Sequence, residues 1–506
     1  MIPFVLKMSN FSIPGYVLLV SVLVFLWTGC AKIPEPTRSL HAGRTGEVAR
    51  CADFFALLDD RVGEAEVFDA GLFRVENYPY LRIDRFTASF AGEVDSEISF
   101  TAWVDRMQLL DRSARRFEIA NLPDTVVTAL DPVNGRNGIN REVANCGDIL
   151  QAADFQKAEN RMKLRKTIQI PDDYIFLRRV LGIYPLTSFF VSYGVSGWHT
   201  DVQKTFSLEP PQSWHTVRYF PVSVMNMAAG SHYLKTGKRD VLGIPVYSRE
   251  ELDYLFQIWA PVWEIQTLGN YDQPGAPIWT HNGSLEVDIG QQPTYTLLSF
   301  TRFNDEILTQ LNYIIWFPSR PKENALDIYG GFLDGLIYRV TLDKKGEALL
   351  YESVHNCGCY YKAYPTDRLR IRLDNGYEEP PLILSAPEID PVTCFMTVTM
   401  ESRTHYVQHL YSTPRKSPDG AEMYLFIPYN RLRSLPVQSG LRKSMFGLDS
   451  IVPGSRRLER FILWPTGVLS PGAMRQWGRH AVSFVGRRHF DDPDFMDRMF
   501  LPSDQK

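Results

Sequence analysis

The chain has 506 residues and a formal net charge of −4, with 44% hydrophobic and 22% charged residues. This balance is typical of a soluble globular fold, and the length exceeds what one hydrophobic core usually serves, so we expect two or three domains. Lysine and arginine occur in scattered pairs rather than in long runs, which argues against a nucleic-acid partner.

An apolar run precedes the first cysteine. Residues 16–27, YVLLVSVLVFLW, are apolar apart from Ser21, and Lys7 is the only charge before Cys30. Twelve residues suit the apolar region of a signal peptide and are short for a membrane span, which needs about 20. We therefore expect residues 1–29 to be a signal peptide of the lipoprotein type. An ordinary secretory signal and an uncleaved anchor are the alternatives.

The sequence LWTGCAK around Cys30 resembles the lipobox of bacterial lipoproteins. The resemblance implies that the Cys30 thiol carries a diacylglycerol, that the signal is cut just before it, and that the new amino group is acylated. Ala31, rather than aspartate, follows the cysteine, which in that family implies sorting to the outer membrane. Two or three acyl chains hold a protein stably on a membrane. The resemblance thus implies a lipid-anchored protein facing the periplasm, with residues 30–46 as a tether.

Helical periodicity dominates the next part of the chain. Apolar residues recur at three- and four-residue spacing in residues 47–62, in residues 99–122 and, more weakly, in residues 147–166. This spacing places them on one face of a helix. We predict a helix-rich domain over residues 47–205.

The remaining residues, 206–506, are predicted to form a β-rich domain with few helices. Ser248 and Glu251 form a capping box at the start of one helix, and Asn282-Gly283 marks a hairpin turn. Further strands are predicted from alternating or β-branched residues, at 294–303, 308–317, 335–342, 347–354, 392–400, 403–413 and 456–464. A short helix is expected at 473–477. The fold class is therefore α+β, a helix-rich N-terminal region followed by a mostly antiparallel β-rich region.

Five cysteines remain after Cys30, at positions 51, 146, 357, 359 and 394. An oxidising compartment favours disulfides among them. Cys51 and Cys146 lie on or beside apolar helical stripes, and we expect them to pair. One of Cys357 and Cys359 is expected to bond to Cys394, which begins a strand-like run.

The segment VHNCGCYY also admits a metal site. His355, Cys357 and Cys359 are alternate residues, so on a strand all three would point the same way, and zinc or copper would accept this ligand set. Cys394 could supply a fourth ligand. A strained bridge between Cys357 and Cys359, with a redox role, is a further alternative.

Two carboxylates suggest a third kind of site. Glu264 stands in the apolar run APVWEIQT, and Asp272 follows in GNYDQPG. A carboxyl group in apolar surroundings has a raised pKa and can act as a general acid, and two carboxylates beside aromatic residues are what glycan hydrolysis needs. The alternative is that Glu264 lies on the solvent face of an edge strand.

We interpret the chain as a lipid-anchored cell-envelope protein that serves as a binding or assembly module facing the periplasm. The alternatives are an envelope glycan hydrolase using Glu264 and Asp272, and a metal-handling protein using His355, Cys357 and Cys359. The expected partners are the membrane, through the lipid on Cys30, and an envelope glycan or protein. No particular cofactor follows from the sequence.

Overall fold

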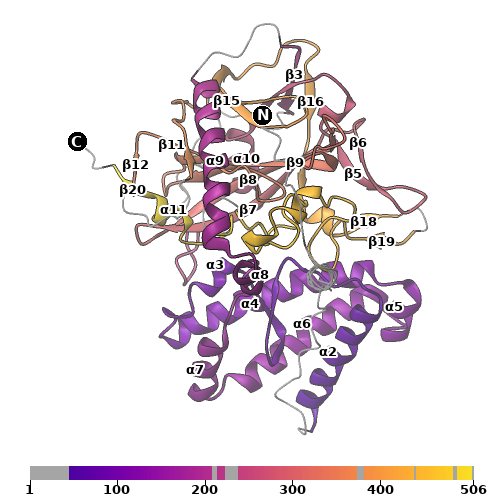
Figure 1. Ribbon diagram of the computed structural model, residues 1–506. Helices are drawn as coiled ribbons and strands as arrows, with labels where there is room; N and C mark the ends of the chain where they lie inside the picture. The colour runs from indigo at the N-terminus through magenta and orange to yellow at the C-terminus, as the bar shows by residue number, and fades with distance from the viewer. Residues whose placement is uncertain are drawn as a thin grey trace, which may run out of the picture. The chain divides into compact units, whose positions relative to one another are not determined.

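The computed structural model describes residues 45–207, 214–222, 238–372, 381–437, 440–482 and 487–503. Within these ranges the fold is α+β, as the sequence predicts, with most helices first and most strands later (Figure 1). The predicted signal peptide, Cys30 and most of the tether lie outside the described residues. Of the helices described, none combines the length and the apolarity needed to span a membrane.

The N-terminal part contains eight helices among the described residues: α2 (Glu47–Glu64), α3 (Arg85–Ala88), α4 (Glu97–Asn121), α5 (Asp124–Leu130), α6 (Gly135–Asp154), α7 (Ala158–Thr167), α8 (Phe176–Leu181) and α9 (Tyr184–Phe206). A short antiparallel hairpin, β1 (Phe73–Val75) with β2 (Tyr78–Ile83), interrupts them. The predicted helices at 47–62 and 99–122 correspond to α2 and α4. The third prediction, 147–166, spans two helices, because α6 ends at Asp154 and its last carbonyls accept hydrogen bonds from Asn160 and Arg161 side chains.

Helices α2, α4 and α6 pack around the β1–β2 hairpin through one apolar core that includes Phe55, Trp103 and Leu150. Buried charges cross this core. Arg82 on β2 donates to both carboxylate oxygens of Glu118 at 2.8 Å, and the guanidinium of Arg115 lies 2.8 Å from carboxylate oxygens of two aspartates. Every buried charge in this network therefore has an opposite partner, as burial requires.

The larger sheet has seven strands in the order β13-β11-β10-β9-β8-β7-β17. Their bounds are β7 (Thr294–Phe303), β8 (Glu306–Arg320), β9 (Gly331–Leu342), β10 (Ala348–His355), β11 (Lys362–Pro365), β13 (Leu382–Ile383) and β17 (Phe426–Pro428). The strands from β7 to β11 are antiparallel neighbours, and only the two edge strands pair in parallel.

The second sheet has five strands in the order β15-β14-β4-β3-β16. Their bounds are β3 (Thr216–Pro221), β4 (Pro261–Gln266), β14 (Cys394–Met400), β15 (Val407–Pro414) and β16 (Glu422–Tyr424). Two of its four pairings are parallel, namely β4 with β14 and β3 with β16. The predicted antiparallel arrangement therefore holds for the larger sheet and only in part for this one.

The two sheets face each other across a shared apolar core, because side chains alternate along their strands. On β8, Tyr313 and Phe317 point into the core shared with Trp263 of β4, whereas Ile314 and Trp316 point to the opposite face. C-terminal residues cover that opposite face. A strand whose two faces are both buried reads as a continuous apolar run, as residues 313–317 do.

The remaining elements are short. They are α10 (Arg249–Ile258), α11 (Phe495–Met499), the 3-10 helices η2 (Asn270–Asp272), η3 (Tyr429–Arg433), η4 (Leu458–Phe461) and η5 (Trp464–Thr466), and the strands β5 (Ala276–Trp279), β6 (Leu285–Asp288), β12 (Leu369–Ile371), β18 (Leu435–Pro436), β19 (Arg442–Lys443) and β20 (Phe500–Pro502). The capping box of Ser248 and Glu251 is present, and the Asn282-Gly283 turn joins β5 to β6. Two predictions are wrong: residues 456–464 form η4 and the start of η5 rather than a strand, and residues 473–477 form no helix.

Candidate functional site

A cavity of about 210 Å³ lies where the helix-rich part meets the larger sheet. One wall comes from the loop at Asp69 and from α3 and α4, and the other comes from β7 and β8. The η3 helix and the turn at 476–478 complete the lining. We call this cavity the interlayer cleft. Its volume is below the usual range of drug-sized pockets, so it suits a small ligand or one residue of a larger one.

Two glycines allow the chain to close one end of the interlayer cleft. Gly478 has φ +88°, and a Cβ atom there would lie 2.8 Å from the carbonyl oxygen of Gly71. A Cβ atom on Gly71 would lie 2.6 Å from Nε2 of Gln476. A side chain at either position would therefore push the two loops apart.

Charged groups are concentrated in the interlayer cleft. Asp69 is buried, and its Oδ2 accepts hydrogen bonds from Arg433 Nε at 2.7 Å and from Gln476 Nε2 at 3.1 Å. Arg433 also donates through Nη1 to Asn430 at 3.1 Å. Its other terminal nitrogen, Nη2, is buried and has no hydrogen-bond partner among the described residues. The cleft wall thus holds a guanidinium donor that remains available.

The opposite charge is also available in the interlayer cleft. Asp491 lines it, and the Oδ1 atom of this side chain is buried without a hydrogen bond, although Arg85 Nε lies 3.5 Å away. Arg106 donates through Nε to Thr87 at 3.0 Å and lies over the rings of Phe86 and Phe300. A ligand with both hydrogen-bond donors and acceptors would satisfy these groups, because an unpaired buried polar atom is costly.

Aromatic side chains line the same cleft. Trp477 is half-buried and packs edge-on against Phe490, and its backbone N–H donates to the hydroxyl of Tyr429 at 2.8 Å. Burial raises the pKa of Tyr429 above its usual value, so this hydroxyl stays neutral. Flat apolar faces beside a few polar groups are the usual lining of a small-molecule site.

A second polar cluster lies in the core between the sheets, around His405. Its Nδ1 lies 2.8 Å from Asp334 Oδ2, and its Nε2 lies 3.4 Å from Asp272 Oδ1. The ring stacks on Phe317 with 3.8 Å between centroids. Burial lowers the pKa of His405, but hydrogen bonds to the two carboxylates outweigh burial and raise it. The residue therefore favours its charged form and acts as the counter-ion of two buried acids.

The two acids proposed from the sequence lie in separate networks. Glu264 on β4 is buried, and it binds Arg218 Nε at 2.7 Å, Thr399 at 2.8 Å and Tyr411 at 2.9 Å. Because β4 lies in the middle of its sheet, the alternative of a solvent-facing edge strand is wrong.

Asp272 has the opposite electrostatics from those of a general acid. Burial raises its pKa, but hydrogen bonds from His405 and from the backbone of Arg403 and Leu268 outweigh burial and lower it. The expected raised pKa is therefore wrong for this residue. The Ser402 hydroxyl donates to Asp272 at 2.7 Å and not to the imidazole, so the cluster lacks the serine–histidine bond of a nucleophilic site.

The segment VHNCGCYY forms a tight turn rather than a strand beyond His355. Gly358 has φ +88°, its N–H donates to the carbonyl of His355 at 2.7 Å, and the His355 N–H donates to the carbonyl of Cys359 at 3.0 Å. His355 points to Asp334, with 3.4 Å between Nδ1 and Oδ1. Within the described ranges, no three histidine, cysteine or acidic side chains are placed to hold a metal ion together. The turn explains why alternate residues do not share one face here.

The predicted bridge from Cys357 or Cys359 to Cys394 is wrong. All three are free thiols; the first two are buried in the core on the outer face of the larger sheet, and Cys394 begins β14 in the other sheet. Burial raises the pKa of Cys357, which keeps its thiol protonated and unreactive.

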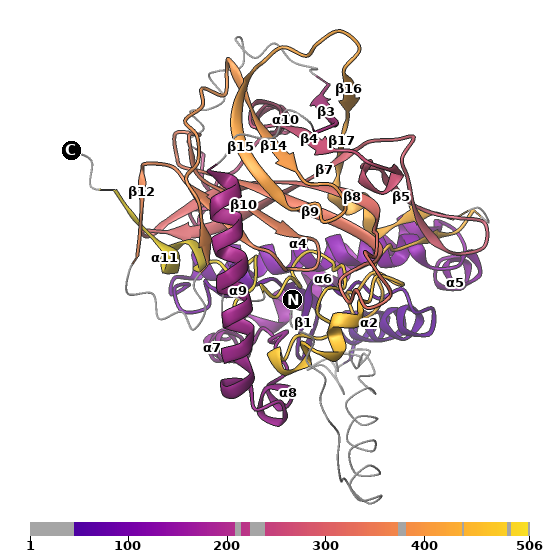
Figure 2. The ribbon, with the colours of Figure 1, turned by 45° about the horizontal axis from the view of Figure 1, so that its top comes forward.

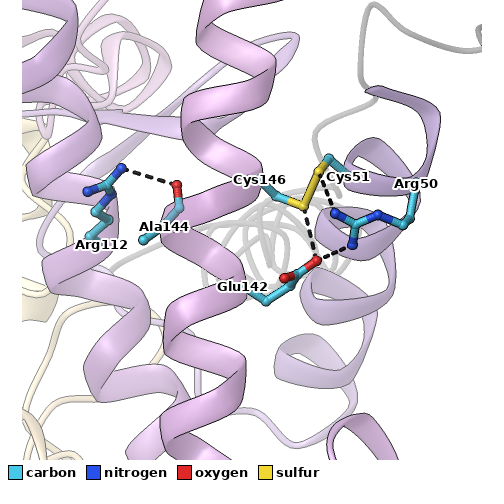
Figure 3. Close-up of a disulfide and its surroundings, with 6 residues drawn as sticks. All are labelled: Arg50, Cys51, Arg112, Glu142, Ala144 and Cys146. Atoms are coloured by element: carbon cyan, nitrogen blue, oxygen red, sulfur yellow. Dashed lines mark hydrogen bonds and ion pairs between the residues drawn. A yellow bond between two sulfur atoms is a disulfide. The ribbon is translucent and has the colours of Figure 1, made fainter. Parts of the chain in front are cut away.

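The expected pair of Cys51 and Cys146 forms a disulfide that joins α2 to α6 (Figure 3). Their Cα atoms are 5.0 Å apart. Arg50 and Glu142 form an ion pair beside the sulfur atoms. The bridge lies in the helical core and stabilises the layer that forms one wall of the interlayer cleft.

A buried lysine beneath α9 completes the set of unusual groups. Lys362 on β11 is 1% exposed, and its Nζ donates to the carbonyl of Val407. Burial lowers the pKa of Lys362 to about 7. The ammonium lies 5.6 Å from the ring of Trp198 and 5.9 Å from that of Tyr406, which close the space around it.

The residues of the interlayer cleft were not identified from the sequence. They come from positions between 69 and 491, and they follow no local motif. The one local feature that could have indicated the cleft is a polar residue followed two positions later by glycine, in DAG at 69–71 and in QWG at 476–478. Comparisons with protein-family models, with curated proteins and with solved structures find no match to this chain.

Proposed function

We propose that the chain is a lipid-anchored binding protein of the cell envelope, and that the interlayer cleft holds a small polyhydroxylated ligand such as a sugar residue of an envelope glycan. The observation that carries the proposal is a pair of buried atoms, Arg433 Nη2 and Asp491 Oδ1, that form no hydrogen bond within the described residues; the second has only the ion-pair contact with Arg85 Nε at 3.5 Å. One needs an acceptor and the other needs a donor. A hydroxyl group can serve as either.

The remaining lining supports a sugar over a purely ionic ligand. Trp477 and Tyr429 offer apolar faces for the C–H side of a ring, and Ser113 offers a further hydroxyl partner. The lining carries both guanidinium and carboxylate groups, so a strongly charged ligand of either sign would meet a like charge.

A larger cavity of about 560 Å³, at the β8–β7 turn and the β9–β10 loop, is less suited to ligand binding. Four of its charged side chains already pair with one another, Lys344 with Glu306 and Arg368 with Asp343. These pairs leave less for a ligand to satisfy, and they provide a matched control site.

The ligand proposal is tested by saturation-transfer NMR and calorimetry with N-acetylglucosamine, glucose, galactose and their disaccharides. Asp491→Asn removes a charge from the cavity, and Ser113→Trp fills it. Each is expected to weaken binding about tenfold or more, as losing a hydrogen bond to a charged group does. Lys344→Gln in the control cavity should leave affinity unchanged. Absence of saturation transfer from every sugar, or equal affinity in all four proteins, would refute the proposal.

The anchor is tested separately. Cys30→Ser is expected to block signal removal, and the intact mass of the wild-type protein should correspond to a chain that begins at acylated Cys30. A mature chain that begins at any other residue would contradict the lipid anchor without affecting the cleft.

A further inference from the structure

The α8–α9 segment exposes an unusual amount of apolar surface. Six large side chains, Phe176, Leu177, Val180, Leu186, Phe189 and Ile462, are between 53% and 73% exposed. We call these six residues the α8–α9 patch. Single exposed apolar residues are normal on a protein surface, whereas a contiguous group marks an interaction site.

The backbone shows that the patch is one surface. The N–H of Ile175 donates to the carbonyl of Gly467 at 2.8 Å, and Arg179 Nη1 donates to the carbonyl of Thr466 at 3.1 Å. These bonds hold α8 against η5, which follows Ile462 directly. In both ribbon views α8 lies at one end of α9 (Figure 2). The exposed side chains of α8, the first half of α9 and the η4–η5 junction therefore lie together.

In the segments that form the patch, every charged side chain that is not buried is basic. Residues 174–200 contain no aspartate or glutamate, and their only full charges are Arg178 and Arg179. In the neighbouring segment the one acidic residue, Glu459, is buried, whereas Arg460 is half-buried and lies 4.6 Å from the ring of Phe461. The segments that form the patch thus carry arginine and apolar side chains but no exposed acidic side chain, and the exposed Asp172 just before α8 is paired with Arg487. Such a surface matches the boundary between lipid headgroups and acyl chains.

We propose that the α8–α9 patch lies on the membrane and inserts its apolar side chains among the lipids, beside anionic phospholipid headgroups. The proposal rests on the proposed anchor, because that anchor holds the folded chain near a bilayer. From Cys30 to the first described residue, 45, the chain can span at most about 50 Å. The tether therefore keeps residue 45, where the described part of the chain begins, within that distance of the membrane.

The two ends of α9 have different surroundings. Its exposed apolar residues, Leu186 and Phe189, fall in its first half, whereas Trp198 and Phe206 in its second half pack against Tyr360 and Tyr364 of the sheet region. One end of the helix thus contacts the lipid and the other end contacts the core above Lys362.

The test uses the full chain, purified and reconstituted into vesicles of phosphatidylethanolamine and phosphatidylglycerol. An environment-sensitive fluorophore is attached at Phe176→Cys or, as a control, at Val133→Cys, both in a Cys394→Ser background. Val133 is 85% exposed and lies between α5 and α6. The α5 helix lies away from α8 in both ribbon views (Figures 1 and 2). Lipids with brominated acyl chains are expected to quench the probe at 176 at least about threefold more than the probe at 133, since only the first reaches acyl depth.

Each outcome decides the proposal. Protein that floats with vesicles and shows strong quenching only at 176 supports it. Protein that floats but shows equal, weak quenching at both positions overturns it and leaves the anchor intact. Protein that does not float overturns it, and the intact mass of Cys30 then shows whether the anchor also failed. A dimer in light scattering that Phe176→Ser with Leu177→Ser abolishes would assign the patch to a second copy and overturn the membrane contact.

Discussion

Asp69 and Arg433 are 364 positions apart in the sequence and form a buried ion pair, with 2.7 Å between Asp69 Oδ2 and Arg433 Nε. Asp69 precedes the β1–β2 hairpin of the helix-rich part, and Arg433 ends η3 in the β-rich part. The pair therefore joins the loop in one wall of the interlayer cleft to the η3 helix that completes its lining, and the cleft should respond to its loss.

Removal of the guanidinium should destabilise the protein strongly. Arg433→Met leaves the Asp69 carboxylate buried without its cationic partner, and we expect a loss of about 3–5 kcal/mol in the free energy of unfolding by urea. Asp69→Asn in the same chain should recover part of that loss. Glu64→Gln, which removes the exposed Arg61–Glu64 pair, is the control and should cost under about 1 kcal/mol. Equal losses of unfolding free energy in Arg433→Met and Glu64→Gln would contradict the role of the buried pair.

Lys362 should make stability depend on pH. Burial lowers the pKa of Lys362 to about 7 in the folded chain from 10.5, the ordinary value expected in the unfolded chain. Between these values the unfolded chain binds the extra proton, so the contribution of the lysine to stability rises with pH and is lost as pH falls through about 7. Relative to Lys362→Met, wild-type unfolding free energy should increase by about 1 kcal/mol per pH unit from pH 7 to 9. If urea titrations give wild type and Lys362→Met the same dependence of unfolding free energy on pH, Lys362 is not desolvated.

Loss of the Cys51–Cys146 disulfide should lower stability, whereas loss of a free thiol should not. Cys51→Ala is expected to lower the unfolding free energy of oxidised protein by about 2–4 kcal/mol, because the bridge spans 95 positions and restricts the unfolded chain. The effect should vanish under reducing conditions. Cys394→Ser, at a half-buried free thiol, is the control. Peptide mapping should find Cys357, Cys359 and Cys394 alkylated before reduction of the denatured protein; a protected Cys394 would contradict the structure.

Gly358 should tolerate no side chain. Its φ is +88°, and an added Cβ atom would lie 2.3 Å from the carbonyl oxygen of Ala481. Gly420 has φ +75° with nothing within 4 Å of an added Cβ atom, so Gly420→Ala measures backbone strain alone. We expect thermal denaturation to show a cost of about 1 kcal/mol for Gly420→Ala and at least about 3 kcal/mol for Gly358→Ala. Similar melting temperatures would mean that the VHNCGCYY turn can move away from Ala481.

Sequence reasoning succeeded where the structure is set by near neighbours. The helices α2 and α4 follow apolar stripes, and α10 begins at a capping box that two residues define. It failed at residues 456–464, where the apolar residues remain partly exposed and none of the described strands pairs with the segment; Glu459 N–H donates instead to the carbonyl of Ile328. A strand needs a partner, and that partner is not visible in a local pattern.

The candidate site was beyond local reasoning for a related reason. Asp69, Arg433 and Asp491 look like ordinary surface charges in the sequence, and only the packing of distant segments brings them to one cleft, with Asp69 and Arg433 buried. The cysteines show the same limit: compartment chemistry indicated oxidation, but it could not indicate that Cys394 begins a strand of one sheet while Cys357 is buried in the core on the outer face of the other. Which thiols meet is decided by topology.

The contacts of Asp69 also bear on the order in which the protein can be completed during synthesis. The helix-rich layer leaves the ribosome first, yet two hydrogen bonds to its Asp69 come from Arg433 and Gln476, the second of them 407 positions later. Until those residues emerge, a nascent chain holds an acidic group that its own layer cannot neutralise. Residues in the last quarter of the polypeptide therefore supply contacts that the helix-rich layer needs. A chain released early would expose the uncovered surface around Asp69 to quality-control proteases.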